Sequence, residues 1–319
     1  MTTKSRTVKP GDTNWHLPTN DYAFKALFAN PGNLEITAGF LNDFFGIDVP
    51  PEEIRFLRDS SIDSIAYRDD ATEEELQRLV ETIRDITIGI DLTDITIELQ
   101  VLPQKRFVWR AVHYLTSVYN ARYDATKGPM PDGRPRDRFR NLKPAWGMNI
   151  VDFTLFPDDG EPYRMFTLRD EVTAQTLLEA PLRLGFFEIP KQISALEHDL
   201  RGDVVSNRAY WAQFFHTGEA PAGAPKYILD AARIMIQINN NPKEARMLTA
   251  TERFIADRDA QQAYALELGH AQGYAQASKE KVIEHSRNAL SQGLEPEMVS
   301  SITGLPLVEV LALDAVMKR

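Results

Sequence analysis

The chain has 319 residues, a formal net charge of −10, 43% hydrophobic residues and no cysteine. Its length suffices for two domains, or for one large domain with an appendage, and the hydrophobic fraction supports an ordered core. The missing cysteines exclude disulfides and thiolate metal ligands. The acidic net charge argues against a broad nucleic-acid-binding surface, although local basic patches can overrule a net value.

Neither a membrane segment nor an export signal is indicated by the sequence. No apolar run approaches the roughly 20 residues needed to cross a bilayer. Residues 1–16 are polar and lack the apolar stretch of a secretory signal. We therefore expect a cytoplasmic protein whose first 16 residues form a flexible arm.

Two helices are predicted after the arm. Residues 21–29, DYAFKALFA, carry an apolar stripe at i, i+3, i+4 spacing, and Thr19 or Asn20 can cap their start. Asp21 lies in the first turn, where an anion suits the helix dipole, and Lys25 follows one turn later. A Pro-Gly pair ends this helix, and NLEITAGFLNDFFG is predicted to form the second.

A β-hairpin is predicted for residues 84–102, RDITIGIDLTDITIELQVL, after an amphipathic helix at residues 71–83. The segment alternates β-branched with polar or small residues, and DLTD interrupts the alternation. We take Leu92-Thr93 as the two-residue turn, which sets the pairing of the two strands.

The hairpin then carries a pair of carboxylates on one face. Asp85 lies opposite Gln100 and Thr87 opposite Glu98, and all four side chains project from the same side because side chains alternate along a strand. Asp85 and Glu98 form a diagonal pair about 7–8 Å apart, close enough to hold Mg²⁺ or Mn²⁺. A longer hairpin loop would change the pairing and favour Asp91 as the ligand.

Two interpretations of this polar face are open. It can be the solvated side of an ordinary hairpin. If a helix covers it, however, buried carboxylates are costly, and a metal ion would offset that cost. Such an ion can activate a water molecule and stabilise the charge that develops in phosphodiester hydrolysis.

The rest of the chain predicts a mixed α/β domain followed by helices. A long helix is expected at residues 106–125 and a central strand at residues 146–156, with a further strand in YRMFTLRD. The order of helices and strands indicates an α/β domain over residues 17–190. Residues 191–319 are predicted to be helical throughout.

Phosphate contacts are predicted for the basic segment RPRDRFRNLK, which has a single acidic residue. Its cations are Arg134, Arg136, Arg138, Arg140 and Lys143. Lys105, Arg106 and Arg110, near the start of the long helix, could add to it, although Arg110 could instead pair with an acid.

The C-terminal segment GLEPEMVSSITGLPLVEVL has the pattern of a helix-turn-helix. It is poor in Lys and Arg, so a dimerisation module is at least as good an interpretation as a DNA reader. The preceding polar helix could act as a spacer or pair with a second copy of the chain to form a homo-oligomer.

The order of these segments resembles the Rpn family of recombination-promoting nucleases, also described as PD-(D/E)XK nuclease family transposases. The resemblance rests on TNDYAFKALF, IELQ, the Tyr-rich helix, LKPAWGMNIVDFTLF and the final TGLPLVEVLAL. It implies a restriction-endonuclease-like PD-(D/E)XK core with a mixed sheet and a helical C-terminal region.

The resemblance also implies a function: divalent-metal-dependent cleavage of DNA. Asp85 and Glu98 would bind Mg²⁺ or Mn²⁺, and Gln100, at a position where many members have Lys, would orient water or phosphate. Asp21 and Lys25 match the family's first-helix motif. Without that Lys, the charge of the transition state must be met by the metal or by another cation. The alternative is a catalytically inactive nuclease fold that binds DNA or a partner.

Overall fold

The computed structural model describes residues 7–57, 85–124, 137, 139–177, 181–198 and 206–317. The predicted helix at residues 71–83 lies outside these ranges. By its tertiary contacts the chain divides into two compact units, Met1–Phe254 and Ile255–Arg319, and each is described by itself.

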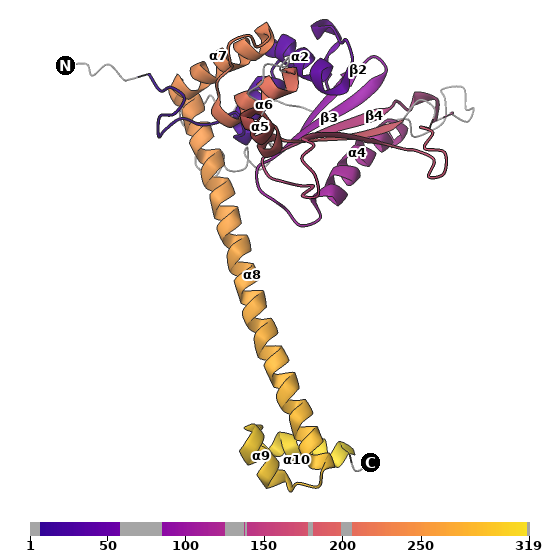
Figure 1. Cartoon of the computed structure of the whole chain (residues 1–319), viewed down its shortest axis with the longest axis vertical. Coiled ribbons are helices and arrows are strands. Elements are labelled where there is room, and N and C mark those ends of the chain that lie inside the picture. The colour runs from indigo at the N-terminus through magenta and orange to yellow at the C-terminus, as the bar shows by residue number, and fades with distance from the viewer. Residues whose placement is uncertain are drawn as a thin grey trace, which may run out of the picture. The chain divides into compact units, whose positions relative to one another are not determined.

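Within the described ranges, the first unit contains a six-stranded mixed sheet in the order β1-β2-β3-β4-β6-β5 (Figure 1). β3 pairs with β4, and β4 with β6, in parallel, while the other neighbours are antiparallel. The strands are β1 (Arg55–Phe56), β2 (Asp85–Ile90), β3 (Thr93–Gln100), β4 (Ala145–Val151), β5 (Tyr163–Thr167) and β6 (Leu182–Glu188). The predicted hairpin and the predicted α/β class are confirmed.

The described helices follow the predicted order. Asn20 caps the first helix, as predicted, because its side chain accepts hydrogen bonds from the backbone N–H groups of Tyr22 and Ala23. Gly46, at φ 65°, ends the second. The helices are α1 (Asp21–Phe28), α2 (Leu34–Phe45), α4 (Phe107–Asp124), α5 (Ile189–His198), α6 (Asn207–Thr217), α7 (Lys226–Asn240), α8 (Pro242–Ser291), α9 (Pro296–Thr303) and α10 (Leu307–Met317).

Each face of the sheet has its own apolar cluster. The isoleucines of β2 and β3 pack with side chains of α1, α2, α6 and α7. On the opposite face, α4 packs Phe107, Ala111, Leu115 and Val118 with Leu184 and other residues of β4 and β6. Because side chains alternate along a strand, the polar residues of β2 and β3 other than Thr93 lie on the face that α4 covers.

Aromatic rings make up much of the first cluster. Trp211 of α6 is fully buried, stacks on Phe215 and Tyr227, and has Phe28 and Phe40 within ring contact. Helices after residue 190 therefore complete the core on which the sheet rests.

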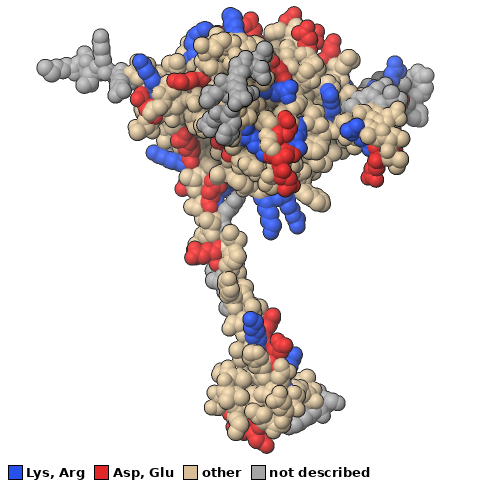
Figure 2. Space-filling model, viewed as in Figure 1, with Lys and Arg blue, Asp and Glu red and all other residues tan. Residues whose placement is uncertain are grey.

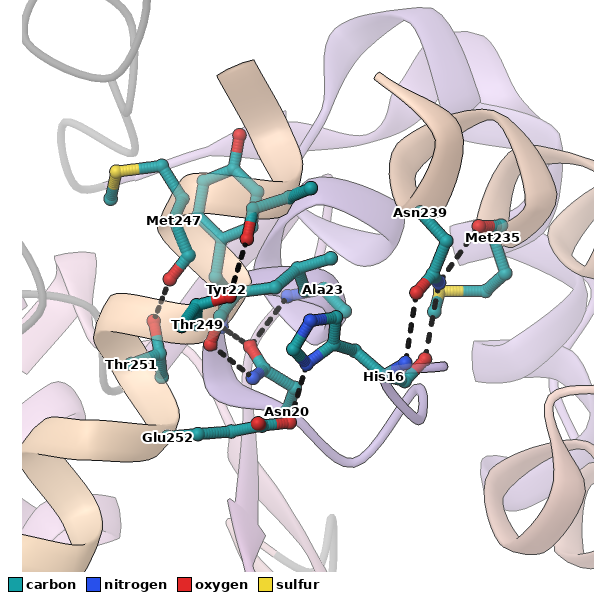
Figure 3. Close-up of polar contacts among 12 residues, drawn as sticks. His16, Asn20, Tyr22, Ala23, Met235, Asn239, Met247, Thr249, Thr251 and Glu252 are labelled. Carbon is teal, nitrogen blue, oxygen red and sulfur yellow. Dashed lines mark hydrogen bonds and ion pairs between the residues drawn. The ribbon is translucent and has the colours of Figure 1, made fainter. Parts of the chain in front are cut away.

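Polar contacts tie the N-terminal segment to α7 and α8 (Figure 3). The backbone N–H of His16 donates to Asn239 Oδ1 at 2.8 Å, and His16 Nδ1 lies 2.6 Å from Glu252 Oε1. Asn20 Nδ2 donates to the Leu248 carbonyl at 3.0 Å. The start of α8 is thus part of the first unit.

The second unit consists of the remainder of α8 with α9 and α10. Val299, Leu305 and Val310 are buried together against Val282 and Leu290 of α8. α9 ends at Gly304, whose φ of 72° reverses the chain toward α10. None of the helices in the described ranges combines the length and hydropathy that a membrane span requires.

Candidate active site on the β2–β3 hairpin

The hairpin pairs in a register different from the predicted one. Its turn is Asp91-Leu92, so Asp85 lies directly opposite Glu98. The predicted pairs, with Asp85 opposite Gln100, are wrong by two residues. Thr93 is buried and joins β3, which leaves Asp, a favoured turn residue, at the tip.

The shift brings the two predicted ligands closer together. A slip of two residues keeps every side chain on its face, so Asp85, Glu98 and Gln100 still share the face that α4 covers. Directly opposed residues have their Cβ atoms about 5 Å apart, against about 7–8 Å for a diagonal pair. The structure describes the backbone of Asp85, which fixes this position in the sheet.

Glu98 is buried and is held by a cation from α4. Its side chain is 9% exposed, and Arg110 Nη2 lies 3.1 Å from Glu98 Oε1. The Arg110 guanidinium also lies over the ring of Tyr114, 5.6 Å from the centroid. Arg110 therefore pairs with an acid, as the sequence left open, and that acid is a predicted metal ligand.

A small cavity with both polar and apolar lining adjoins Glu98 between α4 and the sheet. Its volume is about 20 Å³, which is room for about one water-sized species. Thr87, Thr96 and Asn149 line it from the strands, and Tyr114 from α4. Thr87 Oγ1 is buried without a hydrogen-bond partner among the described residues, so the cavity offers an oxygen that a bound species can use.

The donor set of this cavity fits a hard divalent cation. Oxygen-bearing side chains, Glu98 among them, line the cavity together with the apolar Ala111, Val118 and Leu184. Mg²⁺ typically takes only one or two protein carboxylates, with water and phosphate oxygens as its other ligands. Over the described ranges no group of three or more acidic or histidine side chains could hold a metal ion. Glu98 and its strand partner Asp85 stay the predicted ligands of such an ion.

Gln100 lies two residues after Glu98 on the same face and is 8% exposed. Its side-chain Nε2 donates to the Leu102 carbonyl at 2.9 Å. The backbone carbonyl of Gln100 accepts from the backbone N–H of Asp152 at 3.0 Å. These bonds anchor the end of β3 beside the end of β4.

Asp21 and Lys25 both lie on α1. Asp21 is the first residue of the helix, and Lys25, one turn later, is 9% exposed. The apolar side chains of α1 belong to the cluster on the isoleucine face of the sheet. α1 thus lies on the face of the sheet opposite to the one that carries Glu98 and Gln100.

The predicted phosphate contacts are divided by the structure. Arg134, Arg136 and Arg138 lie outside the described residues. Arg140 is exposed in a short 3₁₀ helix, Phe139–Asn141. Lys143 Nζ instead donates to the carbonyls of Ile90 and Asp91, at 3.4 and 2.5 Å, and so holds the tip of the hairpin.

Sequence reasoning did not single out Asn149. It lies opposite Glu98 in the parallel β3–β4 register, is 3% exposed, and donates from Nδ2 to the Gly185 carbonyl at 3.0 Å. The sequence signal that could have identified it is a carboxamide within the otherwise apolar strand AWGMNIV, because a buried polar group needs a hydrogen-bond partner or a ligand.

Asp152, beside Gln100, carries a testable electrostatic signature. Burial raises the pKa of its carboxyl, and His216 opposes the shift. A raised pKa means that the folded chain binds this proton more tightly than the unfolded one. Stability therefore falls as the pH rises from the pKa of the unfolded chain through that of the folded chain. We expect Asp152→Asn to raise the Tm at about pH 7.5, with the gain vanishing near pH 4.

The control for this measurement is Asp159→Asn. Arg164 lowers the pKa of Asp159, so loss of its charge should have the opposite sign, though a small size, because the carboxyl is exposed. Thermal unfolding of both variants from pH 4 to pH 8 checks the prediction. A Tm difference for Asp152→Asn that stays constant with pH would contradict it.

Comparison with known proteins supports the assignment of the fold. A model of the family described as PD-(D/E)XK nuclease family transposase matches residues 18–265, which span the sheet, α1 to α7 and part of α8. No curated protein and no solved structure matches the chain. The mixed sheet and the family match confirm the predicted nuclease-like core followed by helices. The chain belongs to the PD-(D/E)XK nuclease family transposases.

Proposed function

We propose that this protein is a divalent-metal-dependent DNA endonuclease, recombination-promoting or transposase-like, with its active site on the α4 side of the β2–β3 hairpin. The observation that carries the proposal is the pairing of Asp85 with Glu98 directly across two strands, with Glu98 beside a cavity the size of one water. Membership of a nuclease family supports it.

The residues would divide the work of hydrolysis. Asp85 and Glu98 would hold Mg²⁺ or Mn²⁺, which lowers the pKa of water and stabilises charge on phosphate oxygens. Gln100 would orient the attacking water or a phosphate oxygen. The water oxygen would bond to phosphorus in line as the bond to the leaving oxygen breaks, with the water's proton passing to solvent and the leaving oxygen taking a proton from solvent. Asp21 and Lys25 lie on α1, whose apolar side chains pack against the opposite, isoleucine face of the sheet, so we assign them no step on the α4 side.

DNA contacts would have to come from local groups, since the net charge is −10. On the face drawn in Figure 2, basic and acidic side chains are interspersed and do not form one large basic surface. Lys105, Arg106 and Arg140 are exposed, and we propose them with Arg134, Arg136 and Arg138 as phosphate contacts.

Trp109 is the residue we expect to add a sequence-independent contact. It is 78% exposed on α4, next to Arg110 and within a turn of Lys105 and Arg106. An aromatic ring beside cations suits stacking on an unpaired base, worth about 1–3 kcal/mol. Trp109→Ala should therefore weaken binding of a single-stranded oligonucleotide at least fivefold in fluorescence anisotropy.

The control is Tyr274→Ala, which removes an aromatic side chain that is equally exposed, at 77%, on α8. Its affinity should equal that of the wild type. Equal affinity for Trp109→Ala would remove Trp109 from the DNA-binding surface.

A plasmid assay tests the proposed function. Purified protein should nick or linearise supercoiled plasmid in Mg²⁺ or Mn²⁺, and excess chelator should stop the reaction. The second candidate, an inactive fold that binds DNA, is favoured by Arg110 on Glu98 and by Gln100 in place of Lys. Retention of the plasmid in a gel shift without cleavage in either metal would establish that candidate instead.

The C-terminal helices are the proposed site of self-association. α9 and α10 expose Met298, Ile302, Val308, Leu311 and Val316, an apolar set that a second copy could cover. Sedimentation of the wild type beside Ile302→Glu measures this: a dimer that the substitution dissociates is expected, and a monomeric wild type would refute it.

A further inference from the structure

Two arginines of α4 hold two carboxylates on the same face of β3, in different ways. Arg122 contacts Asp94 through two nitrogens, Nε at 2.7 Å and Nη2 at 2.8 Å. Arg110 reaches Glu98 through Nη2, at 3.1 Å. Charge-assisted hydrogen bonds of this kind are normally about 2.7–2.9 Å long and strongest when bidentate, so the pair at Asp94 is built as a fixed clamp.

The Arg110–Glu98 contact has the features of an exchangeable pair. The Arg110 side chain is 32% exposed, close to the 35% of Arg122, but its guanidinium also rests over the Tyr114 ring, so it has a second place of attachment besides the carboxylate. Glu98 also borders the small cavity, whereas Asp94 does not line it.

A divalent cation at Glu98 would compete with Arg110 for the same carboxylate. Like charges a few ångströms apart in a poorly solvated site repel each other strongly, so the guanidinium would move off the carboxylate when a metal binds. The planar donors of an arginine fit phosphate oxygens well. The strand itself has the neutral Gln100 at the position where a Lys would supply a positive charge to the phosphate.

We propose that Arg110 is a phosphate-binding residue that neutralises Glu98 in the metal-free protein and transfers to a phosphate oxygen of DNA when Mg²⁺ or Mn²⁺ takes the carboxylate. This inference rests on the proposed nuclease function. It assigns to α4 the cation that the Glu-x-Gln sequence lacks.

The test begins with metal affinity, which is measured without DNA. Arg110→Gln removes the competing charge but keeps a donor for Glu98, so it should bind Mn²⁺ about fivefold more tightly than the wild type in calorimetry, the equivalent of an ion pair of about 1 kcal/mol. Its Tm should also rise more on addition of Mn²⁺. Arg122→Gln, the matched control on the same helix, should leave Mn²⁺ affinity unchanged.

Cleavage should change in the opposite direction. At saturating Mn²⁺ the single-turnover rate of Arg110→Gln should fall about 100-fold, as for loss of one donor to transition-state charge. Arg110→Lys keeps the charge and should recover part of the rate together with wild-type metal affinity. A purely structural ion pair would weaken metal binding and cleavage together.

Either arm can overturn the inference. Unchanged or weaker Mn²⁺ binding by Arg110→Gln refutes the competition for Glu98, whatever the DNA result. Wild-type cleavage that Arg110→Gln retains in full refutes the phosphate role. An inactive wild type overturns the proposed function and the phosphate role with it, and the metal arm then decides the competition by itself. If Arg110→Gln does not fold, Arg110→Lys and Arg110→Met replace it in the same assays.

Discussion

Replacing Glu98 by glutamine should lower the rate of DNA cleavage about 10³-fold, the largest effect expected at any single residue. The substitution keeps size and burial but removes the charge that would hold the metal, and electrostatic groups at the reacting centre carry effects of about this size. Single-turnover cleavage of a labelled duplex in Mg²⁺, with DNA binding measured separately, checks it.

Asp85→Asn and Asp91→Asn complete this experiment. Asp85→Asn should be as inactive as Glu98→Gln, and the double variant no worse, because ligands of one ion act as a unit. Asp91 is at the turn, six residues along from the position opposite Glu98, or roughly 20 Å. Its substitution should therefore leave the rate unchanged. Loss of activity in Asp91→Asn, with Asp85→Asn active, would contradict the site.

Trp211→Ala should cost about 3–5 kcal/mol of the free energy of unfolding, the range for truncating a large buried aromatic residue. Trp211 is fully buried among rings from α1, α2 and α7, and its Nε1 donates to Asp43 Oδ2 at 2.9 Å. The truncation would leave a cavity and take one donor from a carboxylate that also accepts from Tyr227.

Urea denaturation followed by circular dichroism measures this loss, with Trp109→Ala as the control. Trp109 is 78% exposed, so the same substitution there should change the free energy of unfolding by less than about 0.5 kcal/mol. If Trp211→Ala lost as little free energy of unfolding as Trp109→Ala, α6 would not be part of the core, contrary to the packing described above.

Local pattern was sufficient for most of the elements. The i, i+3, i+4 stripe of DYAFKALF, its Asn20 cap and the alternation of ITIGI and ITIEL report contacts that form within one helix or hairpin. The shared face of Asp85 and Glu98 followed from the same alternation. That prediction survived the error in register because a slip of two residues preserves the face.

The parts that failed or were missed depend on contacts distant in sequence. The turn was misplaced because Thr93 gains by joining a buried strand, which no local turn rule weighs. Arg110 pairs with Glu98 only when α4 is packed on the sheet. Asn149 lies opposite Glu98 only when β4 is paired with β3. The role of Trp211 in the core likewise depends on α6 packing against α1 and α2.

The most direct test of the site is a calorimetric titration of Mn²⁺ into the wild type, Asp85→Asn and Glu98→Gln, without DNA. The paired carboxylates predict saturable binding by the wild type that either substitution abolishes, while all three proteins keep the same circular dichroism spectrum. Equal Mn²⁺ affinity in all three, or no binding by the wild type, would contradict a metal site on the β2–β3 hairpin.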